Sequence, residues 1–471
     1  MSSQCLFQRH SVKKLVQSFK ENPSKYSEFV DETLERMKLS EHLNIFSYQT
    51  KDQIKKSVAE VTKLYRNGEQ RPLEGIIIGL KDNISAAGYP CYGGSKAFKS
   101  NIAKYDCNLW SKLKIHGAIN GGGLIMHELA YGVSTLNAHF GKVRNPYDSE
   151  RSVGGSSGGS GAVVGSGVLP ISLGTDTGGS IRIPATWNGV VGYRPTIGRW
   201  FPNYGIKMTN TLDTIGPIAT CMDDILLVDQ LVTGQEHEQI QNSQSLRIGI
   251  ANPENFDNLD PEVKTRVDQA IDKLKAKDGI EFVQTDDQVN FPTVFLTSTL
   301  LKIINLEMPN IIKQYIEQNN LNITLQDIGD NIESLDVKDL FIDFAIKNPK
   351  PHSELVRLIN GSRQAVLKEV HSYFKRNRLD AIIYPSVKCL PFRFDDYNPQ
   401  DHSVSHNGSR MNQLDITFQN SVLGSIVNGP CVTLPIQTVK GNLPVGLEIQ
   451  SLTGDDKKLL AIAKYIEDVL I

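Results

Sequence analysis

The sequence lacks long apolar runs, an excess of either charge, and closely spaced cysteines. No stretch of 18 apolar residues occurs, which excludes a membrane-spanning helix. The 50 basic and 52 acidic side chains give a formal charge of -2, so composition predicts neither nucleic acid nor an anionic membrane as a partner. Hydrophobic residues make up 39% of the 471 positions, which also excludes a disordered chain. We expect a globular protein whose partners are small molecules.

The six cysteines show no CxxC or other metal-like spacing. They are Cys5, Cys91, Cys107, Cys221, Cys389 and Cys431. The opening residues, MSSQCLFQRHSVKK, contain charges but not the apolar segment of a signal peptide. We therefore expect reduced thiols in a cytoplasmic protein, without a metal site.

Glycine is concentrated in one part of the chain. Of the 38 glycines, 26 fall between Gly75 and Gly216. Glycine inside a helix or strand destabilises it by roughly 0.5–1 kcal/mol relative to alanine, so this concentration indicates loops, positive φ angles or close backbone contacts.

Short apolar runs alternate with amphipathic stretches, which indicates an α/β fold. The runs predict buried strands at 75–79, 168–173, 246–251, 380–385, 431–437 and 445–450. Helical periodicity is clear at 51–66, 261–276 and 455–470. Because strands occur near both ends of the chain, we expect one sheet drawn from both halves. Residues 285–375 lack strand signals and are expected to be a helical insertion over one edge of that sheet.

The run GGSSGGSG (154–161), followed by GTDTGGSIR (174–182), allows several interpretations. A phosphate-binding loop would need a Lys-Ser/Thr pair after a GxxxxG frame, which is absent. The GxSxG pattern of a nucleophile elbow occurs twice, with Ser156 or Ser157 at its centre, but no strand signal precedes it. A flexible linker is also conceivable, although the apolar segment VLPISL between the two runs favours packing inside the protein.

The fourth interpretation is an active site built from backbone amides. Gly178, Gly179 and Ser180 follow a predicted strand, where successive N–H groups could stabilise an oxyanion beside a nucleophilic Ser180. A serine hydroxyl needs a base. Histidines such as His127 form no evident triad pattern, whereas Lys81 ends an apolar strand, where loss of solvation could neutralise its amine.

These motifs, GLKDN (79–83), GGSSGGSG and GTDTGGSIRIPA, resemble the amidase signature family of serine hydrolases, which use a Ser–cis-Ser–Lys triad. The resemblance covers about residues 70–235 and 380–470. The segments HELAYG (127–132), GYRPT (192–196) and HNG (406–408) look closest to indoleacetamide and mandelamide hydrolases.

The resemblance implies roles for individual residues. Ser180 corresponds to the nucleophile, Ser156 to the bridging serine that follows a cis peptide bond, and Lys81 to the base. The backbone amides of Thr177, Gly178, Gly179 and Ser180 would form the oxyanion hole. Ser157 and Arg182 would hold the serines in place. Two departures from the family pattern, GGGLIM (121–126) and Val153 before the glycine-serine run, put substrate preference in question.

The expected fold is therefore an amidase-signature α/β fold, with one large mixed sheet covered by helices on both faces. Residues 1–471 are expected to form a single domain. Its parts are an N-terminal helical segment (1–70), a catalytic core (71–235), a helical insertion that shapes the substrate pocket (285–375), and C-terminal strands and a helix that complete the sheet (380–471).

The expected activity is hydrolysis of a linear carboxamide, of the arylacetamide type or another small hydrophobic amide, through an acyl-enzyme on Ser180 and without a cofactor. The alternatives are an ammonia-releasing subunit similar to the glutaminase subunit of tRNA-dependent amidotransferases, and a fatty acid amide hydrolase. The family resemblance also implies a homodimer.

Overall fold

The computed structural model describes residues 6–201, 203–237, 239–240, 245–250, 252–283, 289, 291–438 and 443–470. Within them, one sheet of 11 strands has the order β1-β3-β2-β4-β6-β5-β12-β13-β9-β7-β8, and β10 pairs with β11 separately. The strands are β1 (Phe46–Gln49), β2 (Ile77–Lys81), β3 (Ile119–Leu124), β4 (Ile171–Asp176), β5 (Val191–Arg194), β6 (Thr214–Ala219), β7 (Leu246–Gly249), β8 (Ile280–Phe282), β9 (Ala381–Pro385), β10 (Ser403–His406), β11 (Ser409–Asn412), β12 (Cys431–Thr438) and β13 (Pro444–Gln450). A single sheet thus takes strands from both halves of the chain, as predicted.

The sheet is mixed. Strand β2 runs parallel to its neighbours β3 and β4, and β7 runs parallel to β8 and β9. The strands from β4 through β6, β5, β12 and β13 to β9 pair antiparallel. The predicted α/β class with one large mixed sheet is confirmed.

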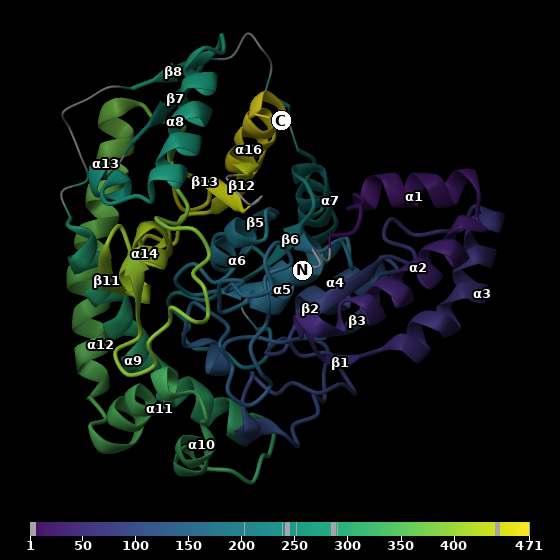
Figure 1. Ribbon diagram of the computed structural model, residues 1–471, viewed down its shortest axis with the longest axis horizontal. Helices are drawn as coiled ribbons and strands as arrows, with labels where there is room; N and C mark the ends of the chain where they lie inside the picture. The colour runs from purple at the N-terminus through teal and green to yellow at the C-terminus, as the bar shows by residue number, and fades with distance from the viewer. Residues whose placement is uncertain are drawn as a thin grey trace.

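The α-helices alternate with these strands and also extend beyond the sheet. They are α1 (Val12–Glu21), α2 (Lys25–Leu39), α3 (Lys51–Asn67), α4 (Asn108–Ile115), α5 (Gly158–Gly165), α6 (Arg182–Trp187), α7 (Met222–Thr233), α8 (Pro261–Lys275), α9 (Thr293–Gln318), α10 (Leu325–Asn331), α11 (Leu335–Phe341), α12 (His352–Leu358), α13 (Gln364–Asn377), α14 (Gln413–Thr417), α15 (Val422–Ile426) and α16 (Asp456–Leu470). Figure 1 shows α1–α3 at one end of the molecule and α9–α13 at the other.

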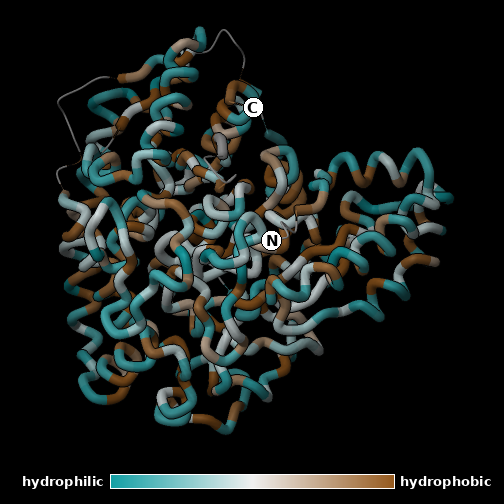
Figure 2. Tube along the Cα trace, in the orientation of Figure 1, coloured by the Kyte–Doolittle hydropathy of each residue, from teal (hydrophilic) through white to brown (hydrophobic). Residues whose placement is uncertain are grey.

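Two groups of helices cover the sheet. Helices α5 and α6 pack on each other and on its central strands, whereas α16 packs against α7, α8 and strand β12. The sheet and its helices share one large hydrophobic cluster, and α9, α11 and α13 contribute to a second. Figure 2 shows hydrophobic segments running through the interior, while the outer helices alternate between hydrophobic and hydrophilic residues.

The six predicted strands all occur, with shifts of a few residues at their ends; Ala251, at the end of the predicted 246–251 strand, lies outside the described residues. The three predicted helices also occur. In the sheet, β1, β3, β5, β6 and β8 were not predicted. The sequences of two of these strands show why they were missed. β3 reads INGGGL and β6 reads TIGPIA, and glycine and proline are both depleted in strands.

The glycine-serine run is neither a linker nor only a turn. From Gly158 its residues form the buried helix α5. A Cβ atom on Gly159 would lie 2.6 Å from the Ile125 carbonyl oxygen, and one on Gly161 would lie 2.9 Å from that of Pro184. Glycine at these positions therefore allows the helix to approach neighbouring backbone. Part of the glycine concentration serves packing rather than the chemistry of the site.

Residues of the predicted insertion, 285–375, form α9–α13 where the structure describes them; 285–288 and 290 lie outside the described residues. These helices bury apolar side chains such as Leu300, Ile303 and Phe341 in the second cluster. No helix in the described ranges is long and apolar enough to cross a bilayer.

The five cysteines within the described residues are free thiols; Cys5 lies outside them. Burial raises the pKa of the thiols of Cys91 and Cys107 to about 12. A thiol with such a pKa is protonated near neutral pH and is a poor nucleophile.

Candidate active site

The site forms where two parallel strands end side by side. Strands β2 and β4 pair in parallel, with Leu80 opposite Leu173, so their carboxyl ends lie side by side at the same end of the sheet. Lys81 is the last residue of β2, and Asp176 is the last residue of β4. The sheet topology therefore places Lys81 beside the segment that leads to Ser180.

Lys81 lies within the protein, with no solvent-exposed surface. Its Nζ donates to Ser156 Oγ at 2.7 Å and to Thr175 Oγ1 at 2.8 Å. Burial lowers the pKa of this amine to about 7, although the carboxylates of Asp176 and Asp213 act in the opposite direction. At neutral pH a large fraction of Lys81 is thus the neutral amine, which can accept a proton.

Ser156 precedes helix α5 and is fully buried. The peptide bond between Gly155 and Ser156 is cis, as the family resemblance implies. The carbonyl of Ser156 accepts a hydrogen bond from the His127 backbone N–H at 3.0 Å. The backbone of this serine is therefore held on one side while its hydroxyl faces Lys81.

Ser180 stands in the turn between β4 and α6. Its exposed fraction is 8%, and it lines a cavity. Its carbonyl accepts the Ser157 N–H at 3.2 Å. Within the described residues, the Oγ of Ser180 makes no hydrogen bond. Lys81 and Ser156 are therefore joined by a hydrogen bond, whereas Ser156 and Ser180 are not. Such contacts often become short only when substrate is bound.

The four predicted oxyanion-hole amides differ from one another. The Gly179 N–H donates to Asp176 Oδ1 at 2.8 Å, so this amide is already occupied. The N–H groups of Thr177, Gly178 and Ser180 have no acceptor among the residues the structure describes. The prediction is corrected at Gly179: its amide anchors the turn, and three amides are left for a ligand.

Asp176 is the anchor of this turn, and the sequence interpretation gave it no role. Arg182 donates to both of its carboxylate oxygens at 3.0 Å, and Arg194 Nη1 donates to Oδ1 at 2.9 Å. Burial opposes ionisation of Asp176, but the two guanidinium groups hold its pKa well below the ordinary value. A permanently charged carboxylate therefore fixes the Gly179 and Ile181 amides.

The two residues predicted to hold the serines act differently. Ser157 Oγ donates to the Thr175 carbonyl at 3.1 Å, and its backbone binds Ser180. Arg182 makes no hydrogen bond to Ser156 or Ser180 among the described contacts. It instead joins Asp176 to Glu448 of β13, whose Oε1 lies 2.5 Å from Nη1. Arg182 thus links the turn that carries Ser180 to strand β13 near the C-terminus.

The cavity in front of Ser180 has a volume of about 410 Å³. Part of its wall comes from two segments, residues 285–375, where the substrate pocket was expected, and residues 390–425. Leu301, Ile304 and Asp336 belong to the first, and His402 and Phe418 to the second. Thr177 and Gly178 line the same cavity as Ser180.

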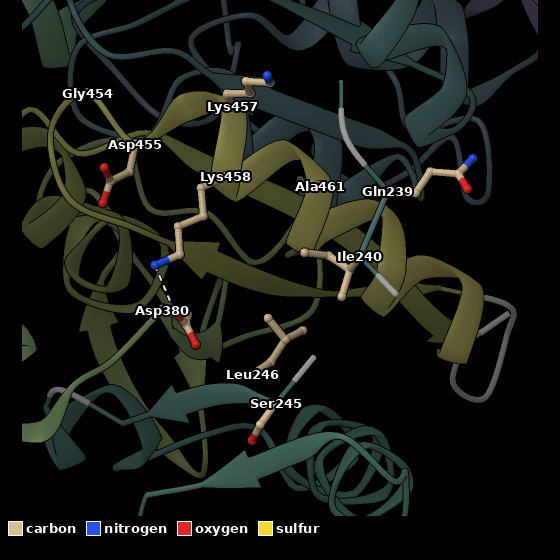
Figure 3. Close-up of a pocket in the computed structure, with 10 residues that line it drawn as sticks. All are labelled: Gln239, Ile240, Ser245, Leu246, Asp380, Gly454, Asp455, Lys457, Lys458 and Ala461. Carbon is tan, nitrogen blue, oxygen red and sulfur yellow. Dashed lines mark ion pairs between the residues drawn. The ribbon is translucent and has the colours of Figure 1, made fainter. Parts of the chain in front are cut away.

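A larger cavity of about 560 Å³ lies elsewhere, between α16 and the start of β7. Figure 3 shows Lys458 paired with Asp380 at 2.7 Å in this cavity. Neither Ser156, Ser180 nor Lys81 lines it, so we do not assign it to the reaction. In the described part of the chain, no three His, Cys, Asp or Glu residues are placed to hold a metal ion.

Comparisons with known proteins agree with these observations. The family model described as Amidase matches residues 28–460. An indoleacetamide hydrolase from Agrobacterium vitis is 33% identical over 404 residues, 84% of each chain. A mandelamide hydrolase from Pseudomonas putida is 32% identical over 423 residues, 86% of this chain and 80% of that one. A crystal structure described as an amidase superposes with a TM-score of 0.83 at 24% identity, covering 98% of this chain and 100% of that chain.

Proposed function

The chain belongs to the amidase family and is an amide-hydrolysing enzyme, and we propose that it hydrolyses small linear carboxamides through an acyl-enzyme on Ser180. The observation that carries this proposal is the contact between Lys81 and Ser156: a buried amine with a pKa of about 7 lies 2.7 Å from a serine hydroxyl. An amine in that state can act as a general base at neutral pH.

The first step is the activation of Ser180. The neutral amine of Lys81 accepts the hydroxyl proton of Ser156, and Ser156 in turn accepts the proton of Ser180. The Ser180 oxygen attacks the amide carbon. The remaining N–H groups of Lys81 donate to Thr175, which keeps the lone pair directed at Ser156.

The second requirement is stabilisation of the negative charge on the amide oxygen. The N–H groups of Thr177, Gly178 and Ser180 supply three donors, and the turn that carries them is held by Asp176. Because these donors are fixed before the substrate binds, little reorganisation is needed when the charge develops.

The C–N bond then breaks. The proton held by Lys81 returns through Ser156 to the departing nitrogen, and ammonia leaves. A water molecule, deprotonated by the same pair, attacks the acyl-enzyme and releases the carboxylate and Ser180. Every proton transfer uses groups of the chain itself, so the mechanism needs no cofactor.

We propose an arylacetamide or a similar small hydrophobic amide as the substrate. The names of the two relatives, indoleacetamide hydrolase and mandelamide hydrolase, both denote amides that carry an aromatic group close to the carbonyl. Apolar side chains including Leu301, Ile304 and Phe418 line the cavity, which suits such a group.

The single sheet that joins residues 46 to 450 supports treating residues 1–471 as one amidase domain. Within this proposal, the chain acts without a second type of subunit. A homodimer stays a prediction from the family resemblance, and sedimentation velocity tests it.

The experiment is an ammonia-release assay with the purified chain on phenylacetamide, indole-3-acetamide and mandelamide. We expect ammonia and the matching acid in equal amounts, without a partner protein, and no release by the Ser180→Ala variant. Release of ammonia only when an amidotransferase partner is added would contradict a stand-alone hydrolase. Release from long-chain amides but not from arylacetamides would contradict the substrate class.

A further inference from the structure

Two carboxylates, Asp336 and Asp339, line the otherwise largely apolar cavity in front of Ser180, and Asp339 is exposed whereas Asp336 is mostly buried. Asp336 lies on α11, in the helical segment 285–375, and lines the same cavity as Ser180. Only 13% of its side chain is exposed. A carboxylate so far removed from water needs hydrogen-bond donors around it.

The imidazole ring of His127 lies beside this carboxylate. Its Nε2 lies 3.1 Å from Asp336 Oδ2. The backbone N–H of Thr135 donates to the other ring nitrogen, Nδ1, at 3.2 Å. Since Nδ1 accepts a hydrogen bond, Nε2 carries a proton and faces Asp336 at ion-pair distance, although the two groups are not aligned as a hydrogen bond.

Asp336 is ionised in this setting. Burial opposes its charge, but His127 and His402 lower its pKa below the ordinary value. Its second oxygen, Oδ1, accepts no hydrogen bond from the side chain or backbone of another residue in the described part of the chain. The neighbouring polar wall residue, Asn305, already accepts from the Tyr131 hydroxyl at 2.5 Å. Asp336 Oδ1 thus stays available as a charged acceptor on the buried part of this wall.

We propose that Asp336 is a specificity-determining residue, which accepts a hydrogen bond from an N–H group on the acyl part of the substrate. The preferred substrate is then an arylacetamide whose ring carries an N–H donor, either a neutral ring N–H or an ammonium group. This inference rests on the proposed function, because it places the acyl group in the cavity in front of Ser180.

The first experiment compares substrates of equal shape that differ in the donor. Indole-3-acetamide is paired with 1-benzofuran-3-acetamide, in which an oxygen replaces the ring N–H. 4-(Aminomethyl)phenylacetamide is paired with 4-ethylphenylacetamide, which lacks the ammonium group. A hydrogen bond to a charged acceptor predicts that kcat/KM is about tenfold or more higher for the donor-bearing member. The pair in which the preference is found identifies the kind of donor.

The second experiment changes the acceptor. In Asp336→Asn, the one remaining acceptor oxygen pairs with His127, and the side-chain NH2 is turned toward the cavity. We expect the kcat/KM ratio for the preferred pair to fall to about one or below, through loss of activity on the donor-bearing substrate. Asp330→Asn removes a charge at an exposed position on α10, away from the residues that line the cavity, and should keep the wild-type ratio.

The outcomes separate this inference from the proposed function. If the wild type hydrolyses both members of each pair equally well, the assignment of Asp336 is wrong although the amidase proposal stands. If Asp336→Asn lowers both members of a pair by the same factor, Asp336 positions the site through His127 and does not select the substrate, which also overturns the inference. If the wild type hydrolyses none of the four amides, the proposed substrate class fails, and the inference fails with it.

Discussion

Lowering the pH through about 7 should switch off hydrolysis by protonating Lys81. The amine is fully buried, and its pKa of about 7 compares with an ordinary value of 10.5. If the neutral amine is the active form, its fraction is about one tenth at pH 6, half at pH 7 and nine tenths at pH 8. Activity is therefore present above the pKa and is lost as the pH falls through it.

The assay is kcat/KM for phenylacetamide between pH 5 and 9 at constant ionic strength. We expect a rise of about fivefold from pH 6 to 7 and of less than twofold from pH 7 to 8. The rate at which a fluorophosphonate labels Ser180 should follow the same curve, because both reactions need the activated serine.

Two variants make the interpretation specific. Lys81→Met removes the base and should lower kcat/KM by about 10²–10⁴-fold, and the acidic limb should disappear with it. Burial also raises the pKa of the neighbouring carboxyl of Asp82 to about 8, so Asp82 could titrate in the same range. Asp82→Asn should keep the limb near pH 7. A profile that is flat from pH 5 to 9, or one that still rises about tenfold per pH unit up to pH 9, would refute the reasoning.

Two further predictions concern the turn that carries Ser180. Arg182→Met leaves the buried carboxylates of Asp176 and Glu448 without a shared partner, and should lower the free energy of unfolding by about 3–5 kcal/mol in urea denaturation. Gly179→Ala should lower the thermal midpoint and the rate of fluorophosphonate labelling, because Gly179 has φ +133° and an added Cβ would lie 2.2 Å from Ser421 Oγ.

Matched controls exist for both. Arg393 forms a solvent-exposed pair with Asp395, so Arg393→Met should leave the free energy of unfolding nearly unchanged. Gly198 also has a positive φ, but no atom lies within 4 Å of an added Cβ. Gly198→Ala therefore measures the backbone cost alone. Equal losses in each variant and its control would show that the buried contacts do not hold the turn.

Much of the fold could be predicted because its signals are local. The runs at 380–385 and 431–437 are apolar, short and closed by polar residues or proline, and both became central strands. The glycine-rich β3 gave no such signal, because its strand geometry depends on pairing with β1 and β2. Helix α5 was missed for the related reason that glycine disfavours an isolated helix, which here is stabilised by packing.

The candidate site was predictable to a similar extent. Loss of solvation at the end of a buried strand was expected to neutralise Lys81, and in the structure burial lowers the pKa of its amine to about 7. The residues that brace the site were not predictable. Arg182 and Glu448 are separated by 266 positions, and His127 and Asp336 meet only when α11 is packed on the core. No spacing in the sequence indicates such long-range pairs.

The most direct test of the central claim is mass spectrometry of the enzyme quenched with acid during turnover of indole-3-acetamide. The account predicts that the protein gains the mass of the acyl group, and that the peptide containing Ser180 carries it. The Ser180→Ala variant should show no gain and no turnover. Acylation of another residue, or ammonia release by Ser180→Ala at the wild-type rate, would contradict the claim that Ser180 is the nucleophile.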